Sequence, residues 1–284
     1  MVASGLVLGL AFGDHLLYPK EVGTVALIVA MTIALSEIHL RGLSLKSEAR
    51  SFFQALGWNY VVLTGLILAF AFLTPDPDLR IGWVVMAAVP SAIAVVPLTS
   101  IAKGNVRSAL VSTALLYVLS LPLVPAITLA FGGRAPPLTD LAIQTFLQIG
   151  LPLLASRILV RRPEIQRVRP VVVNLAFFVL VTMVAGANRS ALADLGLVLS
   201  LAAPALVRTF GIGLAIAGLA VALRRPREER VAWTLFGSFK NLGLTALLAL
   251  SLFGPRAAIP AIVCLVFEIL WLAFLPVLFR GQGA

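Results

Sequence analysis

Charged residues are scarce in this chain of 284 residues: they make up 12% of it, whereas soluble domains carry about 25%. Hydrophobic residues account for 60% and gather in long runs. This balance excludes an ordinary soluble domain. It predicts an all-α polytopic membrane protein, in which each crossing helix needs about 20 apolar residues.

Cysteine and histidine are also rare. Cys264 is the single cysteine, which excludes an internal disulfide and a cysteine-based metal site. The two histidines, His15 and His39, are far apart in the sequence. The chain has no P-loop, no H-E-x-x-H, no G-x-S-x-G and no pair of catalytic acids. We therefore expect neither an enzyme nor a bound cofactor.

Acidic residues are outnumbered by basic ones, and the net charge is +10. Nucleic acid is not the expected partner, because the basic residues lie in short loops between apolar runs. In such loops they set the topology and contact anionic lipid head groups. The lipid bilayer is the expected partner, and a homodimer is left open.

Apolar runs predict ten membrane spans. The first is too short to cross upright, and the eighth is long enough to tilt strongly. Their ranges are 2–13, 23–40, 54–74, 81–102, 107–131, 139–160, 169–187, 194–223, 231–252 and 257–279.

Lysine and arginine predict the orientation. Fifteen lie in the loops after the even-numbered spans and in the C-terminal tail, five lie in the loops after the odd-numbered spans, and two lie within spans. The positive-inside rule then places both termini in the cytoplasm. The short loops are of prokaryotic style and favour an inner (plasma) membrane.

The fourth and ninth spans are both interrupted by helix-breaking or polar residues. The fourth contains Pro90-Ser91 and Pro97, and the ninth contains Gly237, Ser238, Lys240, Asn241 and Gly243. Each is the fourth span of a five-span half. Two halves of five insert with opposite orientation, so the pattern predicts an inverted repeat whose broken helices cross near the midplane.

Pro90, Ser91 and Pro97 have two interpretations. Each proline removes a backbone donor, so freed carbonyl groups near residues 86 and 93 can face a binding site. The alternative is a pair of packing kinks. We keep both interpretations for these three residues.

Three charged residues lie within spans: Arg208, Lys240 and Glu268. Lys240 is about ten residues from Arg230, or about 15 Å of helix rise, which is too deep for easy snorkelling. Buried charges need partners, and we expect a Lys240–Glu268 ion pair. Arg208 either binds an anionic substrate or bridges to Glu268.

Three stretches resemble the bile acid:sodium symporter family. FGSFKNLGLTALLAL resembles its G-M-x-N-x-G-L-A stretch, and VPSAIAVVPLTSIAKGNVRSAL resembles its C-P-G-G-x-x-S-N…A-K-G-D stretch. PAIVCLVFEILWLAF resembles its last helix. The resemblance covers nearly the whole chain and implies one elevator-like unit over 1–284. The panel domain would comprise the spans in 1–53 and 139–190, and the core domain those in 54–131 and 194–279.

The chain departs from this family at the sodium ligands. If Asn241 is the family's asparagine, its sodium-binding glutamate falls near Phe236 or Gly237, and its glutamine falls at Lys240. The Ser-Asn ligands align with Val95 and Val96. We therefore predict that both sodium sites are lost and that Lys240 substitutes for the cation.

The resulting prediction is a secondary transporter of small organic anions that does not depend on sodium and is either proton-coupled or facilitative. The expected substrate contacts are Pro90, Ser91, Pro97, Arg208, Gly237, Ser238, Lys240, Asn241 and Gly243, with Glu268 as charge partner. One alternative is a sodium symporter that uses backbone carbonyl groups. Another is a receptor or scaffold that has lost transport.

Overall fold

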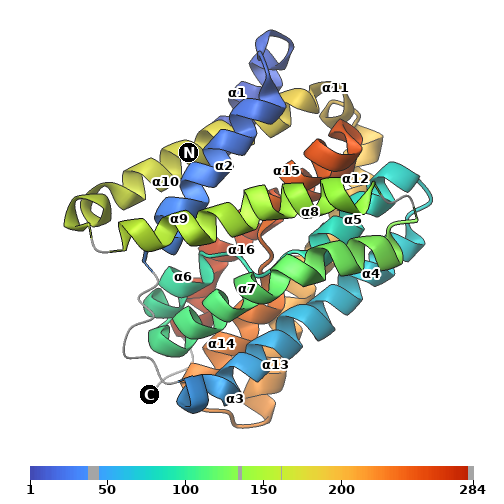
Figure 1. Ribbon diagram of the computed structural model, residues 1–284. Coiled ribbons are helices and arrows are strands. Elements are labelled where there is room, and N and C mark those ends of the chain that lie inside the picture. The colour runs from blue at the N-terminus through green and yellow to red at the C-terminus, as the bar shows by residue number, and fades with distance from the viewer. Residues whose placement is uncertain (38–44, 134–135, 161, 281–284) are drawn as a thin grey trace.

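The computed structural model describes residues 1–37, 45–133, 136–160 and 162–280. These ranges hold 86% helix and no strand, and Figure 1 shows the helices packed into one bundle. The all-α prediction is confirmed. Residues 38–40 of the second expected span lie outside the described part of the chain.

Most helices overlap the expected spans, but α3 begins at Leu45, before the expected start at residue 54, and α10 begins at Pro163, before the expected start at residue 169. Several spans are made of consecutive helical segments. Their bounds are α1 Val2–Phe12, η1 Gly13–His15, α2 Pro19–Leu35, α3 Leu45–Leu56, η2 Gly57–Leu63, α4 Thr64–Leu73, α5 Pro77–Ala88, α6 Val95–Ile101, α7 Val106–Phe131, α8 Leu138–Thr145, η3 Phe146–Gly150, α9 Leu151–Leu159, α10 Pro163–Ala187, α11 Arg189–Leu192, α12 Leu195–Leu206, η4 Val207–Gly211, α13 Ile212–Ala222, α14 Arg227–Ser238, α15 Leu242–Phe253 and α16 Pro255–Arg280.

Seven helices in the described ranges are long and apolar enough to cross a membrane. The protein is therefore an integral, multi-pass membrane protein. The α1 helix is apolar but has only 11 residues, which agrees with the expectation of a short first span. The count of ten crossing helices and the inverted repeat stay predictions.

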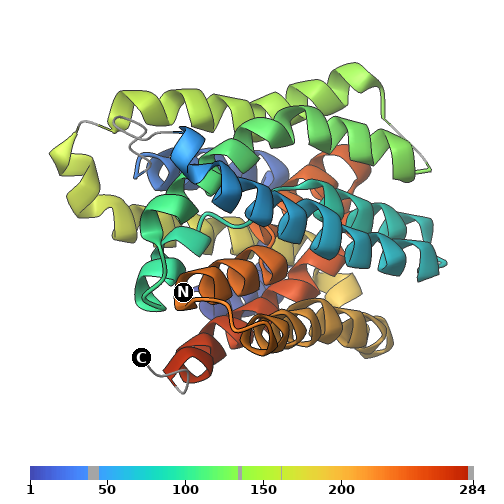
Figure 2. The same ribbon diagram turned by 90° about the horizontal axis from the view of Figure 1, so that it is seen from below.

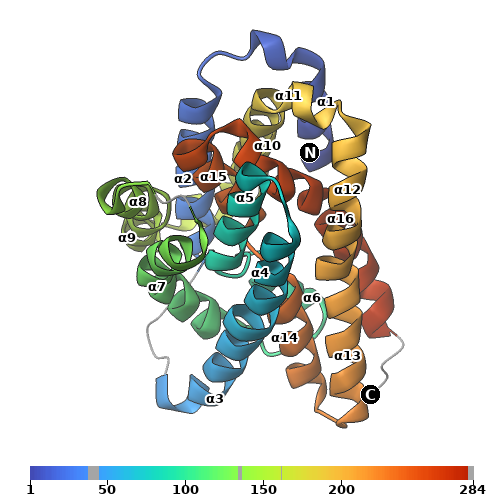
Figure 3. The same ribbon diagram turned by 90° about the vertical axis from the view of Figure 1, so that its right-hand side faces the viewer.

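The α14–α15 pair lies at the centre of the bundle. In its most apolar window 89% of the residues are buried, against 28–39% in the other six. Helices α8–α9 and α12–α13 lie on opposite sides of this centre (Figures 2 and 3). Helix α10 packs against both α1 and α2, while α5 packs against α4, α7, α15 and α16.

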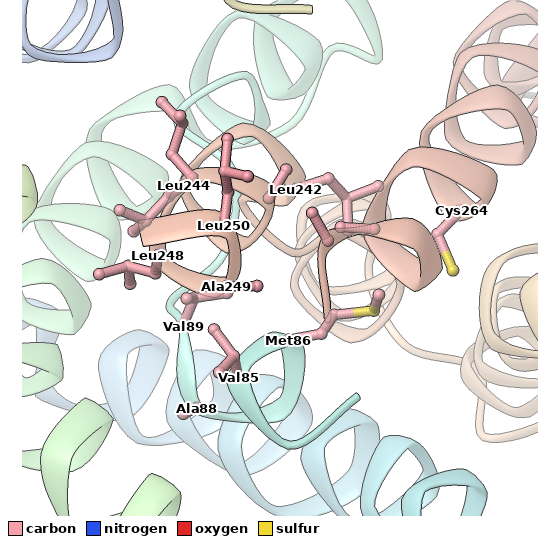
Figure 4. Packing of buried hydrophobic residues seen from close by; sticks show 14 of the residues in the cluster. Val85, Met86, Ala88, Val89, Leu242, Leu244, Leu248, Ala249, Leu250 and Cys264 are labelled. Carbon is pink, nitrogen blue, oxygen red and sulfur yellow. The ribbon is translucent and has the colours of Figure 1, made fainter. Parts of the chain in front are cut away.

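Apolar side chains fill the interface between α5 and α15. Val85 and Met86 of α5 belong to one buried cluster with Leu248 and Ala249 of α15 (Figure 4). A Cβ atom on Gly82 of α5 would collide with the carbonyl oxygen of Ala257. The close approach of α5 to α16 therefore requires glycine at this position.

Polar caps begin several of the helices. Asp76 caps α5 and Asn105 caps α7, each accepting backbone N–H groups of the first turn. Asn105 ends the Ala102-Lys103-Gly104-Asn105 stretch, in which Lys103 has a φ of 56°. This stretch is the tight turn between α6 and α7.

Candidate functional site

Two interrupted helices meet at their breaks. Residues 89–94 separate α5 from α6, and residues 239–241 separate α14 from α15. The backbone N–H of Asn241 donates to the carbonyl oxygen of Pro90 at 3.0 Å. The first half of each broken helix packs against the second half of the other: α5 packs against α15, and α14 packs against α6. Both predicted interruptions are confirmed.

Pro90 explains the end of α5. A residue before proline avoids the helical region, and Val89 is extended, with φ −71° and ψ 156°. Pro97 has a different place from the one we expected. It lies in the first turn of α6, where proline leaves no helical bond unmade, and the Ile93 carbonyl accepts from Val96.

The ammonium group of Lys240 is held by four oxygen atoms. Two belong to side chains, Asn59 Oδ1 at 3.1 Å and Thr64 Oγ1 at 3.0 Å. Two belong to the end of α5, the carbonyl groups of Ala87 at 3.0 Å and Val89 at 2.8 Å. The ring of Tyr60 lies 4.6 Å from Nζ. We call Asn59, Thr64, Ala87 and Val89 the oxygen cage.

Three carbonyl groups at or just before the second break also accept hydrogen bonds from side chains. The amide of Asn59 donates to the carbonyl groups of Phe236 and Phe239, at 2.9 and 3.2 Å. Arg208 Nη2 donates to the Ser238 carbonyl at 3.0 Å. Backbone groups released inside a membrane must find such partners, so these side chains make the irregular segment stable.

The expected ion pair between Lys240 and Glu268 is not formed. Glu268 Oε1 lies 3.5 Å from Arg208 Nη2, and the backbone N–H of Lys240, not its ammonium, donates to it at 3.3 Å. The physical reason is that the cage takes the lysine side chain to the opposite side of the break. The bridging alternative for Arg208 is therefore the one observed.

Asn241 is a helix cap. Its Oδ1 accepts the N–H of Leu244 at 3.0 Å, which begins α15. Its amide nitrogen donates to the Tyr117 hydroxyl at 2.7 Å and contacts Met31 Sδ at 3.3 Å. The cap and the Tyr117 bond hold the side chain in one orientation.

The two glycines of the ninth span serve close packing. Neither has positive φ. A Cβ atom on Gly237 would collide with Ile216, and one on Gly243 would lie 2.9 Å from the Phe177 ring. Both glycines, which the sequence places among the interruptions of the ninth span, thus allow close contact with α13 and α10.

Ser91 and Ser238 are fully buried. The Ser238 hydroxyl donates to the Thr234 carbonyl and accepts from Trp271 Nε1 at 3.0 Å. Both residues, with Pro90, Gly237 and Arg208, belong to the framework of the breaks and are absent from the cavity walls described next.

A cavity of about 500 Å³ lies between the breaks and the first helices. One wall comes from α1, α2 and α10, and the other from both breaks, α6 and α16. The predicted residues in its walls are Pro97, Lys240, Asn241, Gly243 and Glu268. Lys240 is fully buried, and its ammonium group is bonded to the oxygen cage rather than exposed to the cavity.

Sequence reasoning missed two charged residues in the cavity wall. Arg169 Nη2 lies 3.0 Å from Glu37 Oε1, and both residues line the cavity. Glu37 falls near the end of the second expected span and Arg169 at the start of the seventh, so neither stands out as a residue within a span. The available signal was the position of Arg169 next to Pro170 in the polar first turns of a long apolar helix.

No group of three histidine, cysteine, aspartate or glutamate side chains in the described ranges is arranged to hold a metal ion. The candidate site is therefore a cavity lined by the two helix breaks and by the ion pair of Arg169 and Glu37.

The model of the SBF-like CPA transporter family (DUF4137) matches residues 18–280. This match covers both breaks and all the residues that line the cavity except Val2. It agrees with the resemblance to bile acid:sodium symporters. No curated protein matches the chain.

Proposed function

We propose that this chain, which belongs to the SBF-like CPA transporter family and is a membrane transporter, carries small organic anions by elevator-type alternating access without sodium. The observation that carries this proposal is the ammonium group of Lys240 inside the oxygen cage. It is a fixed cation at the crossing of two broken helices.

The cage has the composition of a sodium site. In transporters with broken helices, carbonyl groups at half-helix C-termini coordinate the coupling cation, and Ala87 and Val89 are such groups. An ammonium group has three donors, and four oxygens lie within 3.1 Å of it. These oxygens therefore already hold a cation, and they do not fit an additional sodium ion.

The cavity supports the substrate and the motion that we propose. It lies between α1, α2 and α10, which would form the panel, and the crossed breaks with α16, which would belong to the core. Pockets for small ligands are typically about 300–1,000 Å³. A substrate held there would be carried with the core as it moves along the panel.

Uptake into proteoliposomes tests this function. Radiolabelled pyruvate, succinate and taurocholate are offered to the purified chain with an imposed sodium gradient, an imposed proton gradient or neither. We expect uptake that is independent of sodium and lost in Lys240→Gln without sodium. Lys103→Gln, which removes an exposed lysine, is the matched control.

Three results separate the alternatives. Dependence of the wild type on sodium would favour a sodium symporter and contradict the role of Lys240. Stimulation by a proton gradient distinguishes proton coupling from facilitated diffusion. Binding of these anions without uptake would favour a receptor on the same fold.

A further inference from the structure

The cavity wall contains four charged residues: Glu37, Arg169, Lys240 and Glu268. Lys240 is enclosed in its cage, and Glu268 is paired with the fully buried Arg208. The side chain of Arg169 is 26% exposed and that of Glu37 is 31% exposed. Among these residues, Arg169 is the cation that a ligand in the cavity can reach.

Arg169 belongs to a small polar network at the start of α10. Its Nη2 bonds to Glu37, and its Nη1 donates to Gln166 Oε1 at 3.1 Å. Gln166 Nε2 in turn donates to the Ser36 carbonyl at 3.4 Å, at the end of α2. These bonds use two of the five donors of a guanidinium group, and they orient it at the cavity rim.

Guanidinium groups bind carboxylate, sulfonate and phosphate in a planar, often bidentate geometry. Glu37 already presents such a group to Arg169, so its carboxylate shows how a ligand anion would be bound. A partly exposed ion pair is weak because water screens it. An incoming anion can therefore replace the Glu37 carboxylate at the guanidinium group.

The rest of the cavity suits an apolar body. Its walls include Ile93, Phe177, Phe239, Leu265 and Leu272. A ligand that fills this space while its charge meets Arg169 must be amphipathic, with the charge at one end.

We propose that Arg169 binds the anionic group of an amphipathic organic anion, and that Glu37 occupies the guanidinium group when the cavity is empty. The ligand is a transported substrate only if the proposed function holds. The binding role itself does not depend on transport.

Charged thiol reagents test the role without a known substrate. Asn174 is exposed, lines the cavity and lies five residues beyond Arg169 on α10, which is about 7.5 Å of helix rise. We would introduce Asn174→Cys together with Cys264→Ala, since Cys264 is fully buried. The full chain in nanodiscs is then treated with anionic sulfonatoethyl or cationic trimethylammonioethyl methanethiosulfonate.

The measured quantity is the ratio of the anionic to the cationic modification rate at low salt. We expect Arg169→Gln to lower this ratio by about tenfold, the lower end of electrostatic effects on association rates, and Glu37→Gln to raise it. Arg167→Gln removes the same charge from an exposed position of the same helix and should leave the ratio nearly unchanged.

Three outcomes would overturn the proposal. Equal effects of Arg167→Gln and Arg169→Gln would mean that only the general field matters. A lower ratio in Glu37→Gln would indicate an ion pair that merely holds the helices together. No modification of the introduced cysteine by either reagent would mean that ligands cannot reach the cavity rim.

The uptake assay separates this role from transport. Where anions are transported, Arg169→Gln should raise KM and Glu37→Gln should lower it, with little change in maximal rate. A shifted reagent ratio without uptake of any anion would support Arg169 and contradict the proposed function. Uptake of an anion with an unshifted reagent ratio would support the proposed function and contradict the role of Arg169.

Discussion

The backbone nitrogen of Asn241 donates to the carbonyl oxygen of Pro90 at 3.0 Å, so the two broken helices are joined at the points where each is interrupted. This bond places the segment that follows α5 next to the segment that contains Lys240. The side chains of Lys240 and Asn59 then satisfy the carbonyl groups around it. The crossing is therefore a polar structure enclosed by apolar helices.

Replacing Lys240 should create a response to sodium. Lys240→Gln removes the ammonium group from the four oxygens of the cage. The Ala87 carbonyl keeps a bond from the Thr64 hydroxyl, but Asn59 Oδ1 and the Val89 carbonyl lose this donor. Each unsatisfied buried group costs roughly 1–3 kcal/mol, so thermal unfolding in detergent should begin several degrees lower. Sodium chloride should restore part of this loss in Lys240→Gln, and choline chloride should not. A wild-type protein that sodium stabilises equally would contradict the prediction.

The Arg208–Glu268 pair should show strong coupling between its members. Arg208→Met leaves a buried carboxylate beside the second break, and breaking such a pair typically costs about 3–5 kcal/mol. The double variant Arg208→Met/Glu268→Gln should recover a large part of the lost stability, because no buried charge remains unpaired. Thermal unfolding of the two single variants and the double variant measures this. Purely additive effects would show that the two side chains act separately.

Gly82 should not tolerate a methyl group. A Cβ atom there would collide with the backbone carbonyl of Ala257, whereas one on Gly65 of α4 would meet no atom within 4 Å. We expect Gly82→Ala to destabilise the protein by roughly 1–3 kcal/mol. Gly65→Ala is the matched control and should be neutral or stabilising by up to about 1 kcal/mol. Similar unfolding temperatures for both variants would contradict the close packing of α5 on α16.

Asp76 should contribute a pH-dependent increment of stability. Burial raises the pKa of its carboxyl group. Hydrogen bonds from Arg256 and from the N–H groups of Leu79 and Asp78 lower the pKa by more than burial raises it, so the net pKa is below its ordinary value. The stabilisation is thus present above the unfolded pKa of about 3.9 and is lost as the pH falls through the folded value.

Asp76→Asn tests this increment, because asparagine also caps helices and the variant removes only the charge. At pH 7 its unfolding temperature should be slightly lower, by an amount that fits the 0–1 kcal/mol of an exposed pair. The difference from the wild type should vanish in acid. A difference that persists at low pH would point to the cap and not to Arg256.

Both interruptions are predictable from the sequence, because Pro90 and the Lys240-Asn241 pair stand out in apolar runs. The partners of the charged residues cannot be predicted from the sequence. Glu268 lies on α16, and only its position in space determines that Arg208, and not the Lys240 side chain, reaches it. The oxygen cage depends on backbone carbonyl groups that have no signature in a sequence. Arg169 was hidden because basic residues near loops are ordinarily read as topology signals.

Glycine has the same ambiguity. In a linear sequence Gly237 and Gly243 indicate a flexible helix, yet both are fixed by neighbours that are distant in the chain, Ile216 and Phe177. Packing of this kind is decided by three-dimensional contact and cannot be inferred from spacing.

The cation in the oxygen cage is attached to the chain by its own side chain. This nitrogen cannot leave the site as a sodium ion can, so the site is filled at every sodium concentration. In the proposed transport cycle it would return with the protein, and no sodium ion would flow down its gradient through this site. Energy for accumulation, if the protein accumulates its substrate, would then come from a proton or from another part of the molecule.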